Sequence, residues 1–99
     1  YNIMSMEDFR KLTGKQAVAR DVAFRPEIVE ISTQPIEKEG YLTMKGKVSV
    51  SLPHGNVLRY AVLCGDKQVD VDVLFKKATL IENNTDVYLA LKEEDCILL

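Results

Sequence analysis

The sequence predicts an all-β fold, a small barrel of about six or seven strands with one or two short helical turns. Two patterns support this prediction. Apolar and polar residues alternate along several stretches, as they do in half-buried strands, and turn-forming residues separate these stretches at roughly every ten positions. With 99 residues, the chain is long enough for one domain with a modest hydrophobic core.

A short helix is expected near the N-terminus. Ser5 has the side chain of an N-cap residue, Asp8 follows three positions later, and Gly14 is suited to end the helix. We expect an edge strand just before it, over residues 2–6, and extended chain over residues 16–24.

The step Arg25-Pro26-Glu27 comes next. Pro26 has no amide hydrogen to donate, so we expect it at the start or edge of a strand. Ile28 and Ile31 are then expected to enter the core, while Arg25 and Glu27 fasten the start of the strand to a neighbouring segment. Residues 32–40 are expected to form an exposed loop.

A long strand is expected over residues 41–52. Gly46 interrupts its alternation and predicts a bulge or a bend. The apolar residues of this strand share one parity, which predicts a common face: Leu42, Met44, Val48, Val50 and Leu52.

Further strands are expected over 57–63, 68–75 and 86–91, where β-branched and aromatic residues recur. The turn at 53–56, which contains Gly55, precedes the first of them, and other turns are expected at 65–67 and 82–85. Residues 76–81 are ambiguous. Residues 92–95 predict one helical turn, and 96–99 predict a short final strand.

Composition excludes several classes of function. The formal net charge of −2 gives no overall electrostatic support for binding nucleic acid. Cys64 and Cys96 are far apart and form no CxxC pair, so both are expected to be reduced, packed thiols. The chain has no Gly-rich phosphate-binding loop and no run of about eighteen apolar residues, so neither nucleotide hydrolysis nor a membrane span is expected.

No catalytic, cofactor-binding or metal-binding set is predicted. His54 lies in a turn and is interpreted as a solvated residue, and the nearby Asp66, Asp70 and Asp72 as a polar outer face. The candidate surface for a ligand or partner combines basic residues with an aromatic ring, as in OB-folds that bind single strands: Lys45, Lys47, Arg59 and Tyr60.

Several segments follow one another in the order and spacing of a known domain. They are Phe24-Arg25-Pro26-Glu27, then Met44-Lys45-Gly46-Lys47-Val48, the Gly55 turn with Leu58-Arg59-Tyr60 after it, and residues 68–73 and 87–99. Together they resemble the transport-associated OB (TOBE) domain at the C-terminus of ATP-binding subunits of bacterial ABC importers, in the branch serving sugars, polyamines and iron(III). Arg25, Pro26, Glu27, Gly46 and Gly55 form the structural motif of this resemblance.

The chain departs from the family where Asn83-Asn84 replace the usual glycine before the last long strand. Asparagine tolerates the left-handed conformation, so the turn is expected to survive. The resemblance implies a connecting segment with an edge strand over residues 1–21 and a TOBE barrel over residues 22–99.

The resemblance also implies a function. The domain would be non-catalytic, since it lacks Walker A, Walker B and signature motifs, and ATP with Mg would bind to the nucleotide-binding domain of the parent chain. It would support regulation or dimer formation, with that domain, a second copy of the subunit and the membrane permease as partners. It would lie in the cytoplasm at the inner face of the plasma membrane, and the transported substrate would be chosen elsewhere.

The residues leave one alternative open. A stand-alone OB-fold module that binds an oligonucleotide or a small oxyanion would explain the same barrel. Self-association through unpaired strand edges is expected in either case.

Overall fold

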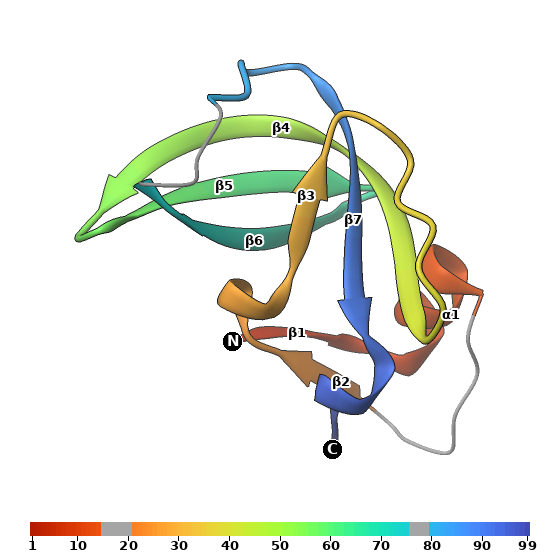
Figure 1. Ribbon diagram of the computed structural model, residues 1–99. Coiled ribbons are helices and arrows are strands. Elements are labelled where there is room, and N and C mark those ends of the chain that lie inside the picture. The colour runs from red at the N-terminus through yellow and green to blue at the C-terminus, as the bar shows by residue number, and fades with distance from the viewer. Residues whose placement is uncertain (15–20, 76–79) are drawn as a thin grey trace.

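The computed structural model describes residues 1–14, 21–75 and 80–99 (Figure 1). These residues form a three-stranded sheet with the order β1-β2-β8 and a five-stranded sheet with the order β3-β7-β4-β5-β6, both antiparallel. The prediction of a small, OB-like all-β fold is confirmed. The elements are β1 (Asn2–Ser5), α1 (Met6–Thr13), β2 (Asp21–Phe24), η1 (Pro26–Ile28), β3 (Glu30–Ser32), β4 (Tyr41–His54), β5 (Val57–Cys64), β6 (Lys67–Leu74), β7 (Asp86–Lys92), η3 (Glu93–Asp95) and β8 (Ile97–Leu98).

The predicted N-terminal helix is confirmed as α1. The Oγ atom of Ser5 accepts a hydrogen bond from the amide of Asp8 at 3.1 Å, and Gly14 ends the helix with a φ of 76°. The edge strand expected before it is β1, at the outer side of the three-stranded sheet. Of the extended stretch expected over residues 16–24, residues 16–20 lie outside the described residues, as do 76–79 of the ambiguous stretch 76–81.

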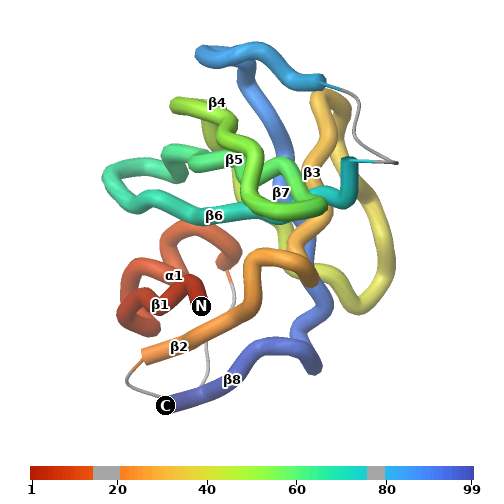
Figure 2. Tube along the Cα trace, turned by 90° about the vertical axis from the view of Figure 1, so that its left-hand side faces the viewer, coloured from red at the N-terminus to blue at the C-terminus, as the bar shows by residue number. Residues whose placement is uncertain are grey.

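The predicted connecting segment shares its core with the rest of the chain. Met4, Met6 and Phe9 are buried in one cluster with Phe24 and the inner faces of the large sheet. The rings of Phe9 and Phe24 lie 6.2 Å apart between their centroids. Residues 1–14 therefore share one hydrophobic core with the described residues of the large sheet. Figure 2 shows the backbone of β1 and α1 below the strands β5 and β6.

Asn2 links the two sheets by hydrogen bonds. Its Nδ2 atom donates to the backbone oxygen of Asp70 at 2.9 Å, and its Oδ1 atom accepts from the Asp70 amide at 2.8 Å. Asp70 lies in β6, which is the last strand of the large sheet. The side-chain amide of Asn2 thus bonds both the N–H and the C=O of Asp70, as the backbone of a neighbouring strand would.

The Pro26 prediction needs a correction. Pro26 does not open a strand but begins the 3₁₀ helix η1, where its fixed φ suits the first helical position. The strand follows at β3, and Ile28 and Ile31 are partly buried against the core. The η1 turn, which leads into β3 at one edge of the large sheet, packs against β6 at the other edge.

The predicted parity of the long strand is also wrong beyond Val48. A register shift between Val48 and Val50 marks a bulge in β4, which reverses the faces of the residues that follow. Val48 is fully buried, whereas Val50 and Leu52 are 37% and 57% exposed. Of the bulge or bend predicted at Gly46, the bulge lies instead between Val48 and Val50.

Gly46 has a different role. A Cβ atom at this position would lie 2.5 Å from Cγ1 of Val62, 2.8 Å from Sγ of Cys64 and 2.9 Å from the backbone oxygen of Leu63. The glycine is required because β5 crosses close to the backbone of β4 at this point. At the turns, Gly55 has a φ of 64° and Asn84 a φ of 67°, which confirms that asparagine fills the left-handed position.

We predict that Gly46→Ala destabilises the fold by about 1–3 kcal/mol, because the added methyl group has no space beside Val62 and the Leu63 backbone. Urea unfolding followed by circular dichroism measures the change. Thr43→Ala, at an exposed position in the regular part of the same strand, is the matched control and should change the free energy of unfolding by less than about 0.5 kcal/mol. Equal stability of the two variants would contradict this account of Gly46.

Candidate functional site

The predicted basic surface does not come together as a strip. Lys45 lies with its Nζ atom 5.9 Å from the centre of the Tyr88 ring, and Lys47 lies 3.6 Å from an Asp86 carboxylate oxygen. Arg59 is in β5, beyond the bulge of β4. Each cation therefore has its own partner on the outer surface of the large sheet.

Arg59 is held by a bidentate pair with Asp72. Its Nε atom donates to Oδ1 at 2.7 Å and its Nη2 atom donates to Oδ2 at 2.9 Å, across the β5-β6 ladder. This hydrogen-bonded guanidinium lowers the pKa of the Asp72 carboxyl. The geometry makes the arginine part of the sheet surface, where it stabilises the strand pair.

The prediction that Tyr60 lies at a ligand surface is wrong. Its side chain is 1% exposed and belongs to the hydrophobic core. Its hydroxyl oxygen accepts a hydrogen bond from the amide of Ile81 at 3.0 Å. The alternation of β5 accounts for this burial, because Tyr60 shares its face of the strand with the buried Leu58 and Val62.

The Arg25-Pro26-Glu27 motif lies at the surface. The guanidinium carbon of Arg25 is 5.0 Å from the centre of the Tyr1 ring, and its Nη1 atom is 4.0 Å from an oxygen of Glu27. Both side chains of that ion pair are 58% exposed, so solvent screens it. The contact with Tyr1 is the one that reaches the N-terminal strand.

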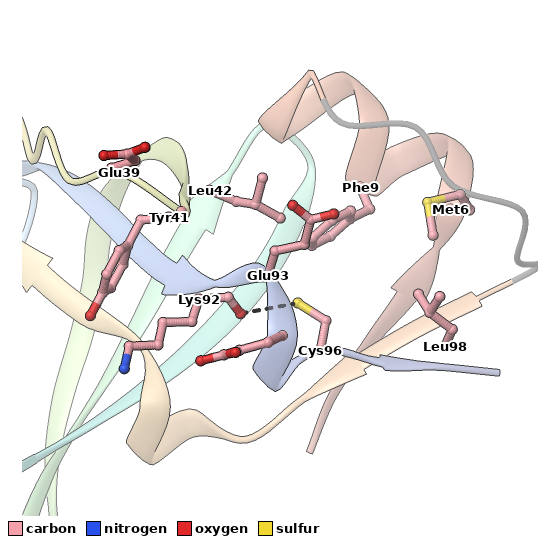
Figure 3. Close-up of a pocket in the computed structure, with 11 residues that line it drawn as sticks. Met6, Phe9, Glu39, Tyr41, Leu42, Lys92, Glu93, Cys96 and Leu98 are labelled. Atoms are coloured by element: carbon pink, nitrogen blue, oxygen red, sulfur yellow. Dashed lines mark hydrogen bonds between the residues drawn. The ribbon is translucent and has the colours of Figure 1, made fainter.

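A groove of about 630 Å³ lies where the two sheets meet (Figure 3). Its apolar residues come from α1, the start of β4 and the C-terminal end of the chain: Met6, Phe9, Leu42, Cys96 and Leu98. Its polar rim comes from the loop before β4 and from the turn after β7: Glu39, Tyr41, Lys92, Glu93 and Glu94, with the backbone of Gly40.

The rim is acidic. Among the described residues that line it, the carboxylates of Glu39, Glu93 and Glu94 accompany the ammonium group of Lys92. The loop and the turn are tied together, since the Glu93 amide donates to the Gly40 oxygen at 3.4 Å. A ligand that fits this groove therefore needs apolar groups for its floor and positive charge for its rim.

Cys96 in this groove is not an activated nucleophile. Burial raises the pKa of its thiol, and the neighbouring Asp95 and Glu93 carboxylates raise it further. Its Sγ atom lies 3.9 Å from the backbone oxygen of Lys92. A raised pKa keeps the thiol neutral near pH 7, which is unfavourable for nucleophilic or metal chemistry.

The three-stranded sheet has an apolar outer face. Ile3, Ala23 and Ile97 lie opposite one another across β1, β2 and β8. Ile3 is 64% exposed and Ile97 41% exposed, while the alternate residues Met4 and Val22 face the core. Both chain termini lie at this sheet, so the exposed apolar side chains of Tyr1 and Leu99 lie nearby (Figure 1).

Within residues 1–14, 21–75 and 80–99, no three histidine, cysteine or carboxylate side chains are grouped to hold a metal ion. Asp70 and Asp72 instead accept hydrogen bonds from Gln68 and Arg59. The helices in the same ranges include none that is long and apolar enough to cross a membrane. No family model matches the chain, and no curated protein does so either.

We predict that the buried thiol of Cys64 makes the fold less stable at high pH. Burial raises the pKa of Cys64 from 9.0 to about 11, so the unfolded chain ionises first as the pH rises. The free energy of unfolding should fall from pH 9.0 to about 11 by on the order of 2 kcal/mol. Urea unfolding across this range measures the slope, and Cys64→Ala provides the reference without the thiol. Equal slopes for the two proteins would contradict the prediction.

Proposed function

We propose that this chain is a non-catalytic accessory domain of the ATP-binding subunit of an ABC importer, where it supports assembly or regulation. Three features support the proposal: the ordered segments that resemble a TOBE domain, the small OB-like fold, and the apolar outer face of the three-stranded sheet. The last of these carries the most weight, because it is a property of the folded surface.

The outer face has the character of a contact surface. Ile3 and Ile97 present branched apolar side chains to solvent on both sides of Ala23. Ala23 itself is only 4% exposed, so the exposed apolar surface of this row comes from the two isoleucines. Exposed apolar side chains that lie close together are typical of regions that pack against another body. The N-terminus belongs to the same sheet, so a nucleotide-binding domain joined before Tyr1 would lie beside this face.

The proposal assigns the chemistry to other parts of the importer. ATP and Mg bind in the nucleotide-binding domain, and the permease forms the path through the membrane. A second copy of the subunit is the other partner, and the complex lies at the cytoplasmic side of the plasma membrane. The accessory domain contributes packing surfaces, which agrees with the raised pKa of both thiols and with the separately paired cations.

The gene gives the first test. Sequencing upstream of the codon for Tyr1 should find a Walker A motif and an ABC signature motif in the same reading frame. An upstream region without these motifs would contradict the proposal.

The folded protein gives the second test. In the full-length subunit, Ile3→Lys with Ile97→Lys should loosen the contact between the two domains, because buried lysines at a contact are costly. Limited proteolysis of the domain junction should then be on the order of tenfold faster. The matched control is Val50→Lys with Leu52→Lys, which adds the same charges at exposed apolar positions of the large sheet. Equal cleavage rates in the two variants would show that the outer face makes no domain contact.

A further inference from the structure

The proposed function assigns no role to the groove between the sheets. Its floor is formed by Phe9, Met6 and Leu42, and Phe9 is only 3% exposed even though it lines the groove. Figure 3 shows these side chains together with Glu93 and Leu98 around one opening. The groove is therefore a well-packed apolar surface with charged residues at its rim.

Leu98 is the exposed end of a row of apolar side chains on the inner face of the small sheet. Met4, Val22 and Leu98 form one row across β1, β2 and β8. Met4 is 6% exposed and Val22 is fully buried, but Leu98 is 55% exposed. A residue placed beside Leu98 would extend this row over the groove.

The backbone of β8 offers a place for such a residue. Within the described part of the chain, β8 pairs with β2 alone. The Leu99 amide donates to the Asp21 oxygen at 2.9 Å, so alternation along the antiparallel pair turns the backbone groups of Leu98 away from β2. An extended segment could bind those groups and form a fourth strand.

The charges of the rim select among such segments. Among the described rim residues, the exposed carboxylates of Glu39 and Glu94 outnumber the ammonium group of Lys92, so an acidic segment would be repelled and a basic one attracted. The loop that carries Glu39 and the turn that carries Glu93 are joined by the hydrogen bond to Gly40, which fixes the rim in place. Apolar residues flanked by lysine or arginine match both the floor and the rim.

We propose that the groove binds an extended segment of a partner protein, with apolar residues flanked by lysine or arginine, which adds as a strand to the free edge of β8. The apolar side chains lie beside Leu98 over Phe9, and the basic side chains reach the carboxylates of the rim. This site is separate from the outer face of the same sheet, so it does not rest on the proposed role in an importer.

The probe for the test is the labelled peptide Lys-Arg-Leu-Val-Phe-Arg-Lys, titrated by fluorescence anisotropy and by amide shifts in two-dimensional NMR. Binding should saturate below about 1 mM peptide. Binding of the peptide should move the amide signals of Leu98, Cys96 and Phe9. The affinity should weaken several-fold between about 20 mM and about 500 mM salt.

Two control peptides test the charge and the strand pairing. The same peptide with its basic residues replaced by glutamate should not bind. N-methylation of alternate amides should abolish binding, since it blocks strand pairing.

Variants separate the groove from the general charge of the protein. Replacing Glu39 and Glu94 by glutamine should weaken binding several-fold at low salt. Replacing Glu27 and Glu82 by glutamine changes the net charge equally at exposed sites outside the groove and should leave binding within about twofold. Equal weakening by the two double variants, equal binding of the acidic peptide, or an absence of binding at low salt would each overturn the proposal.

Discussion

The two hydrogen bonds between Asn2 and Asp70 connect two sheets that share no backbone ladder within the described residues. Asn2 is 6% exposed, so its amide is bonded away from most competing water. Around it, the small sheet and α1 place Met4, Met6 and Phe9 against the large sheet. The relative position of the sheets, and with it every surface between them, depends on this contact and on the shared core.

The candidate surfaces follow from that arrangement. The groove has its floor on α1 and β4 and its rim on the loop before β4 and the turn after β7, so it exists only while the sheets keep their positions. The apolar outer face belongs to the small sheet alone and faces away from the core. The outer face and the edge of β8 are therefore two different surfaces of the small sheet.

Local signals in the sequence predicted the local structure well. The cap at Ser5, the left-handed turn at Asn84, the helical turn at 93–95 and the short last strand depend on neighbouring residues, and all are present. Contacts between distant residues were missed. The parity of β4 depends on a bulge between Val48 and Val50 that alternation alone does not locate. The burial of Tyr60 follows the alternation of β5, where Tyr60 shares the inner face with Leu58 and Val62. Asn2 and Asp70 are 68 residues apart along the chain, so no local pattern in the sequence indicates their hydrogen bonds. The groove likewise has no local signal, because distant segments form it.

Hydrogen exchange at the amide of Asp70 tests most directly whether Asn2 joins the sheets. This amide lies on the outer edge of β6, where the amide of Gln68 has the same orientation and serves as the reference. We expect Asp70 to exchange at least about tenfold more slowly than Gln68 in the native protein, and to lose this protection in Asn2→Ala. Asn2→Asp should keep part of it, because its carboxylate still accepts the bond from Asp70. Unprotected exchange at Asp70 in the native protein, or unchanged protection in Asn2→Ala, would contradict the account.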